Sequence, residues 1–369
     1  MNKKNLVVLI AALAATSAYA QSSVTVYGLV DTAVRMTTAE ANGKSQTAMT
    51  EGAFQGPRVG FKGEEDLGGG TAAVFKLESG FLSNTGASDQ QGQLFGRQAF
   101  VGLKDKSLGE LDAGRQYGVA FDVLGNYDPL GVGNFNENSW EAVLYGLRFD
   151  NTLKYTNTWG PVTAEVQYSI GGQAGSSSIG NTTGAALTYA QGPLSVSVID
   201  QQSTDANSNK LNVAGAGGSF VTGPTTVYLN YFNAKRDAGF AKATNNLGGA
   251  LANTSLMGNA GNTLQRTDSV WTVGALFQAT PAWSFIAGYM TDSVSNDSSA
   301  GNSGKIATAY VVADYAFSKR TDVYFTVDHT TLSGGEVGAE ANSVANFGMD
   351  SLGNETSRNG VAVGLRVKF

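Results

Sequence analysis

The chain has 369 residues with 48 glycines, a single histidine, no cysteine and a formal net charge of −6. The lack of cysteine excludes disulfides and thiolate metal sites, and one histidine excludes a metal centre built on several imidazoles. The acidic charge argues against a nucleic-acid partner, because phosphates require a basic surface.

The first twenty residues have the organisation of a secretory signal peptide. Lys3 and Lys4 precede an apolar stretch over residues 6–15, and small residues lead to Ala20. The apolar stretch is shorter than the ~20 residues of a spanning helix, so we expect cleavage after Ala20. The mature domain would then cover residues 21–369, and loss of the two lysines would bring its charge to −8.

Beyond this leader, the hydrophobic pattern is that of strands. No apolar run approaches 18 residues, so a membrane-inserted chain would have to be a closed barrel. Segments of roughly 7–12 residues alternate between apolar and polar side chains, most clearly over residues 162–169, 322–328 and 360–369. In the last of these, Leu365 shares its face with three valines, while Arg366 lies on the opposite face.

The connections between these segments alternate between short and long. The short ones are tight turns at residues 64–70, 105–109, 157–161, 191–193, 221–224, 280–282 and 318–321. The long ones are rich in Gly, Asn, Ser, Thr and Asp and cover residues 35–56, 82–95, 117–149, 171–183, 202–209, 236–267, 293–305 and 332–359. Seven turns and eight loops separate 16 strands, which predicts an all-β, antiparallel transmembrane barrel with short periplasmic turns and long extracellular loops.

The third long segment, residues 117–149, is the candidate for a constriction inside the barrel because it is long and mixed in charge. Strand alternation places several basic residues on the predicted lumen face. Opposed rows of acid and base would create a transverse field across a narrow pore. The acids of this segment are Asp122, Asp128, Glu137 and Glu141. The basic lumen positions are Arg58, Lys62, Lys76, Lys104 and Lys154.

Five stretches of the chain form a specific combination: residues 23–31, 58–68, 96–103, 111–116 and 366–369. Together they resemble the general trimeric porins of Gram-negative outer membranes, of the type common in β-proteobacteria. The resemblance implies a 16-stranded barrel, a homotrimer, and a third loop folded into the lumen. It also implies surrounding outer-membrane lipid and lipopolysaccharide, and insertion by the barrel assembly machinery.

The resemblance further implies a basic side of the constriction at Arg58, at Arg97 or its neighbour Gln98, and at Arg148, with the acidic partners on the third loop. Strict alternation disagrees for Arg97, because it places this residue on the lipid or subunit face with Ala99. In similar barrels a terminal aromatic residue is the address read by the assembly machinery, and Phe369 occupies that place here.

The sequence therefore predicts a cell outer-membrane porin, not an enzyme, through which ions and small hydrophilic solutes diffuse passively. No cofactor, metal or catalytic residue is expected. Two alternatives stay open at this point. One is a substrate-selective channel with a fixed solute site, and the other is a secreted β-rich adhesin without a pore.

Overall fold

The computed structural model describes residues 23–40, 43–133, 136–241, 249–338 and 353–369. The predicted signal peptide lies outside these residues and stays a prediction. Within this part of the chain, no helix is both long and apolar enough to cross a membrane.

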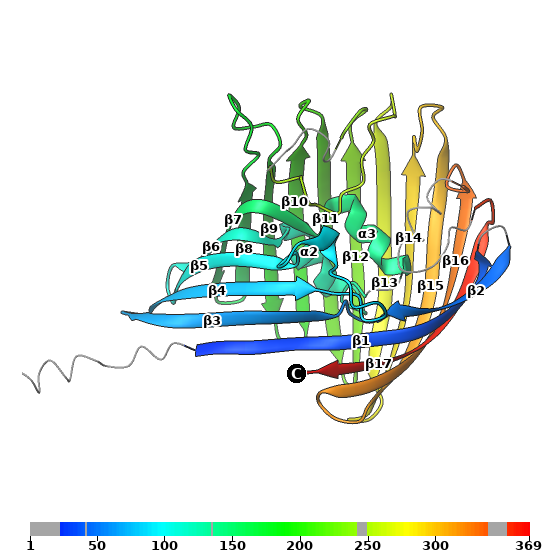
Figure 1. Ribbon diagram of the computed structural model, residues 1–369, viewed down its shortest axis with the longest axis horizontal. Coiled ribbons are helices and arrows are strands. Elements are labelled where there is room, and N and C mark those ends of the chain that lie inside the picture. The colour runs from blue at the N-terminus through cyan, green and yellow to red at the C-terminus, as the bar shows by residue number, and fades with distance from the viewer. Residues whose placement is uncertain (1–22, 41–42, 134–135, 242–248, 339–352) are drawn as a thin grey trace, which may run out of the picture.

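The described residues are dominated by long antiparallel strands that curve into one barrel (Figure 1). The strands are β1 (Ser23–Glu40), β2 (Lys44–Glu51), β3 (Arg58–Gly68), β4 (Thr71–Gly80), β5 (Gln98–Asp105), β6 (Gly109–Tyr117), β7 (Arg148–Trp159), β8 (Val162–Ser169), β9 (Thr182–Gln191), β10 (Leu194–Thr204), β11 (Lys210–Thr222), β12 (Thr225–Arg236), β13 (Arg266–Gln278), β14 (Trp283–Ser295), β15 (Ser303–Ala316), β16 (Thr321–Gly334) and β17 (Ser357–Lys368). Two short helices, α2 (Val119–Leu124) and α3 (Asn136–Tyr145), lie between β6 and β7.

The barrel closes through the first and last strands. From β3 onward each strand pairs with the next, and β17 returns to β1 with Val34 opposite Val363. The other edge of β1 is shared, because residues 23–29 pair with β3 and residues 32–40 pair with β2. β2 and β3 together fill one position of the wall, and the predicted 16-stranded closed barrel is confirmed.

The alternation of side chains separates a lipid face from a water face, as the sequence predicts. In β16, Phe325 and Val327 are exposed on the outer face, whereas Tyr324, Thr326 and Asp328 are buried on the inner face. A successive pair of residues points to opposite sides of a sheet, so the polar residues of each strand collect inside. The wall therefore presents apolar side chains outward and polar ones inward.

All seven predicted tight turns join consecutive strands at one end of the barrel. Three of them are Gly–Pro turns, in which Gly160, Gly192 and Gly223 have φ angles of 59°, 58° and 55°. The flanking residues pair directly, so each loop contains only two residues. A positive φ followed by the fixed negative φ of proline is the pattern of a type II′ turn, whose twist matches that of paired strands.

The first long loop is shorter than predicted. The sequence places a loop over residues 35–56, but β1 continues to Glu40 and β2 occupies Lys44–Glu51. Met36 and Met49 are exposed on the outer face. The polar residues around them in the sequence obscure the apolar alternation that would have marked them as strand positions. The predicted start of this loop was therefore wrong, because backbone pairing extends the strands beyond the clear apolar pattern.

The interior on one side is filled by an apolar cluster between the helices and the wall. α2 and α3 lie inside the ring of strands (Figure 1). Val119, Leu124 and Tyr145 from this region are fully buried against wall residues such as Leu211 and Phe232. The helices therefore narrow the lumen by lying against one side of the wall and leaving space on the other.

We predict that a positive charge on the outer face destabilises the barrel far more than the same charge on the inner face. Val166 is exposed on the outside of β8, and its neighbour Glu165 points to the inside. Val166→Arg should lower the free energy of unfolding by about 2–4 kcal/mol near the bilayer midplane. Urea titration in lipid vesicles measures this, with Glu165→Arg as the depth-matched control. Equal losses in both variants would contradict the assignment of faces.

Candidate functional site

The third loop, here called L3 (residues 118–147), leaves β6 and folds into the barrel as predicted. Gly118 has extended backbone angles and precedes α2, so the chain turns inward directly after Tyr117. α2 is followed by a single 3-10 turn, Gly125–Tyr127, and α3 returns the chain to β7 at Arg148.

Two glutamines of the wall hold both helices of L3. The Gln167 side-chain oxygen of β8 accepts a hydrogen bond from the Val119 amide at 2.8 Å. Gln201 of β10 accepts from the Ala120 amide at 3.2 Å and donates to the Tyr145 carbonyl at 2.7 Å. These buried hydrogen bonds give partners to two amides at the start of α2 and to a carbonyl at the end of α3, groups that have no partner within their own helix. The bonds therefore fix the path of the loop.

The predicted acids of L3 anchor the loop instead of facing open space. Asp122 forms an ion pair with Lys154 of β7. Asp128 accepts hydrogen bonds from the Val132 amide at 2.7 Å and from the Tyr310 hydroxyl at 3.1 Å. The side chain of Glu137 lies outside the described residues. Neither Asp122 nor Asp128 is among the residues that line the constriction cavity described below.

Glu141 is a third anchor and carries an unusual charge state. Its carboxyl accepts a hydrogen bond at 2.6 Å from the hydroxyl of Thr272 on β13, and the residue is 3% exposed. Burial, reinforced by the negative charge of Asp128, raises the pKa of Glu141 to about 8. The carboxyl is therefore protonated at neutral pH, and L3 is docked on the wall through a neutral acid.

A second segment, residues 52–57 between β2 and β3, also turns inward. The Asp31 carboxylate accepts hydrogen bonds from the Gln55 amide at 3.0 Å and the Tyr324 hydroxyl at 2.7 Å. The same tyrosine hydroxyl accepts from the Ala53 amide at 2.8 Å. Phe54 is consequently buried with Leu130 of L3 in one apolar cluster. This segment closes the lumen on the side facing the tip of L3.

Between L3 and the opposite wall lies a cavity of about 610 Å³, called here the constriction cavity. Four arginines line it together with Tyr117: Arg58, Arg97, Arg115 and Arg148. Arg97 donates to the Tyr117 hydroxyl at 2.9 Å and to Glu78 at 2.7 Å. Arg148 lies over the Tyr117 ring at 4.6 Å from its centroid. Three predicted basic residues, Arg58, Arg97 and Arg148, are thus brought together.

The four arginines differ in how their charge is compensated. Arg97 is paired with Glu78 at 2.7 Å, and Arg115 with Asp150 at 2.6 Å. Among the described residues, neither Arg58 nor Arg148 forms an ion pair. Arg58 donates instead to the neutral Gly56 carbonyl at 2.9 Å. Two carboxylates, Glu51 and Asp89, also line the cavity.

Strict alternation predicts Arg97 on the outer face, and this prediction was wrong. β5 begins at Gln98, one residue later, and Arg97 is buried against Glu78 inside the barrel. Arg115 pairs across from Ala99 and should also point outward, but it lines the same cavity. Sequence reasoning missed Arg115 as a site residue.

The cause is a local break in strand pairing. The register between β6 and β7 shifts between Gly114 and Gln116, where Gly114 has a φ of 142°. A side chain at Gly114 would lie 2.2 Å from the Ala99 carbonyl, so glycine is required here. A bulge of this kind redirects the following side chain. The glycine before Arg115 was the one signal in the sequence that could have indicated this.

The remaining predicted residues lie elsewhere. Lys62 faces Lys76 across the β3–β4 pair, and both ammonium groups lie 5.7–5.9 Å from the centroid of the Tyr27 ring. Neither lysine lines the constriction cavity.

Phe369 ends the chain beside β1, where its backbone exchanges two hydrogen bonds of 3.0 Å with Gly28.

Comparisons with known proteins agree with this architecture. The family model described as Gram-negative porin matches residues 6–335. An outer membrane porin protein of Bordetella pertussis is 34% identical over 220 residues, covering 52% of this chain and 57% of that protein. Outer membrane porin protein 32 of Delftia acidovorans is 33% identical over 215 residues, covering 55% of this chain and 60% of that protein. The chain thus spans less than two thirds of the length of these relatives.

Solved structures show the same fold. The anion-selective porin from Comamonas acidovorans superimposes with a TM-score of 0.73 at 23% identity, covering 95% of this chain and all of that one. OmpT of Vibrio cholerae superimposes with a TM-score of 0.66 at 14% identity, and the match covers 94% of this chain and 98% of that one. With its closed barrel, its inward third loop and the family match over most of its length, the chain belongs to the Gram-negative porins of the outer membrane.

Proposed function

We propose that this barrel is a water-filled channel through which ions and small hydrophilic solutes diffuse passively. The constriction cavity carries the proposal, because it lies beside L3 inside the barrel and is lined by four arginines and two carboxylates. A charged and narrow passage sorts solutes by size and sign, since the field between fixed charges is strong where water is scarce. Conductance steps after addition of the purified protein to a planar bilayer test this, and a silent bilayer would overturn it.

We further propose a preference for anions. Three of the acids predicted to oppose the arginines, Asp122, Asp128 and Glu141, anchor L3 and do not line the cavity. Arg58 and Arg148 line the cavity without a carboxylate partner among the described residues. The structural neighbour from Comamonas acidovorans is itself described as anion-selective. Assembly as a homotrimer belongs to the same proposal, and it rests on the family resemblance.

Replacing either unpaired arginine should weaken the anion preference. Arg58→Ala and Arg148→Ala each remove one positive charge from the constriction, and the anion-to-cation permeability ratio should fall roughly twofold per substitution. The reversal potential across a salt gradient measures this ratio. Lys106→Ala is the matched control, because Lys106 is exposed in the turn between β5 and β6. Unchanged reversal potentials in both arginine variants would place them outside the ion path.

The neutral Glu141 predicts a pH-dependent docking of L3. The native pKa of about 8 lies above the ordinary value of 4.5, so the folded state holds a proton that the undocked state releases. Docking is therefore most stable below pH 4.5 and weakens as the pH rises toward 8. Hydrogen exchange measures this through the protection factors of the α3 amides, which compare each observed rate with the intrinsic rate at the same pH. These protection factors should fall at least about tenfold between pH 5 and 8. Glu141→Gln should abolish this dependence, while Glu65→Gln at an exposed position of β3 should leave it unchanged.

Phe369 is proposed as the assembly signal, which rests on the family resemblance and on its place at the end of the outward row of β17. Phe369 is 52% exposed, and its ring packs over Gly28 of β1. Phe369→Ala should reduce the amount of assembled, heat-modifiable barrel in cells to roughly half or less, while purified protein refolds normally in detergent. Lys368→Ala is the control. Normal assembly of Phe369→Ala in cells would refute the role.

A further inference from the structure

A second extracellular loop reaches into the barrel and docks on L3. This loop, called here L6, joins β12 to β13 over residues 237–265, of which 242–248 are not described. The Met257 amide donates to the Val143 carbonyl of α3 at 2.8 Å. Ser255 accepts from the Leu147 amide at 2.9 Å and donates to the Ala142 carbonyl at 3.2 Å. Three hydrogen bonds therefore join L6 to the end of L3.

The contact between the two loops is also apolar. Leu251 and Leu256 of L6 are completely buried, and both belong to the cluster that contains Leu144 and Tyr145 of L3. Gly146 has a φ of 80°, and a side chain there would lie 3.1 Å from Leu256. The turn at the end of L3 thus leaves space that L6 fills.

L6 also contacts the basic wall of the constriction cavity through a shared carboxylate. Asp150 at the start of β7 accepts from Arg115 at 2.6 Å and from the Asn253 amide group at 2.6 Å. Arg115 in turn donates to the Asn253 carbonyl at 3.1 Å. Asn253 and Ser255 line the constriction cavity together with the arginines. L6 therefore covers Arg115 and forms part of the boundary of the cavity.

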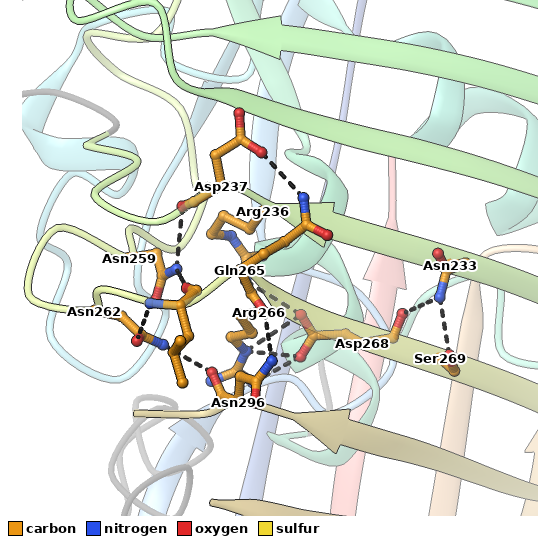
Figure 2. A network of polar contacts seen from close by, with 11 residues as sticks. Asn233, Arg236, Asp237, Asn259, Asn262, Gln265, Arg266, Asp268, Ser269 and Asn296 are labelled. Atoms are coloured by element: carbon orange, nitrogen blue, oxygen red, sulfur yellow. Dashed lines mark hydrogen bonds and ion pairs between the residues drawn. The ribbon is translucent and has the colours of Figure 1, made fainter. Parts of the chain in front are cut away.

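The root of L6 is held by a polar network, drawn in Figure 2. Asp268, fully buried, binds Arg236 from the end of β12 and Arg266 from the start of β13 at 3.2 and 2.7 Å. Asn262 donates to the Asn296 carbonyl at 2.7 Å, which ties L6 to the neighbouring loop. Asn259 donates to the Asp237 carbonyl at 3.1 Å, which joins the two ends of the loop. The loop thus enters the lumen from a fixed base.

We propose that L6 is a second constriction loop and that L3 and L6 together set the width of the pore. Asn253 and Ser255 hold residues 249–257 beside the four arginines of the constriction cavity, called here the arginine cluster. This deepens the channel function proposed above and rests on it. Residues that hold L6 on L3 and on Asp150 then determine which solutes pass, although they lie outside both L3 and the arginine cluster. Removing L6 from this position would widen the passage and uncover Arg115.

The test releases L6 without changing any charge. Asn253→Ala/Ser255→Ala/Leu256→Ala should raise single-channel conductance roughly twofold, shift the reversal potential toward anions, and admit larger sugars into liposomes. The control Thr263→Ala alters an exposed side chain at the base of the same loop and should match the wild type. Conductance and exclusion limit equal to wild type in the release variant would overturn the inference. A wild-type protein that does not conduct would instead overturn the channel function.

A second experiment is independent of whether the release variant folds. The chain contains no cysteine, so the thiols of Val143→Cys/Met257→Cys would be the only ones present. The direct backbone hydrogen bond between these residues places them within the range of a disulfide. Mild oxidation should consume both thiols within one chain and leave conductance at the wild-type level. Free thiols that persist after oxidation, or a disulfide that changes conductance severalfold, would contradict docking of L6 in the open channel.

Discussion

The structure depends on one requirement: every backbone amide and carbonyl inside a bilayer needs a hydrogen-bond partner within the protein. The pairing of β17 with β1 meets this requirement, because closure removes both free edges of the sheet. Once the ring is closed, strict alternation sends one half of the side chains to lipid and the other half to the lumen. The lumen then becomes the place where this chain can keep its arginines, acids and inward loops.

The ionisable residues of the sites described above have two different roles. Asp122, Asp128 and Glu141 attach L3 to the wall through an ion pair or hydrogen bonds, so their positions define the shape of the passage. Arg58 and Arg148 line the constriction cavity, and the proposed anion preference rests on them. The same division applies to Asp150, which compensates Arg115 and also binds L6. Four arginines and two carboxylates line the constriction cavity, so its lining is more basic than the net charge of the chain suggests.

Most of the barrel was predictable from the sequence, and the site only in part. Turn residues such as Gly192 and Pro193 and the alternation of β17 have local causes, so periodicity and turn chemistry found them. The position of Arg97 has a nonlocal cause, since its direction depends on where β5 begins and on its contact with Glu78. The anchoring role of Glu141 depends on Thr272, which lies 131 residues away in the chain. Arg115 was missed because the shift between β6 and β7 reverses its side, and a single-strand pattern cannot show a shift that belongs to a pair.

The bulge at Gly114 has a consequence for how such channels diverge. This glycine carries no charge and does not line the constriction cavity, yet the direction of Arg115 follows from the backbone angle that glycine permits. A replacement there would move a guanidinium across the wall while the number of charged residues stayed the same. Two chains of identical charge composition could then differ in ion permeability, and a comparison of their charged residues alone would find no reason for it. The ion permeability of such a pore thus depends partly on glycine residues, which carry no side chain of their own.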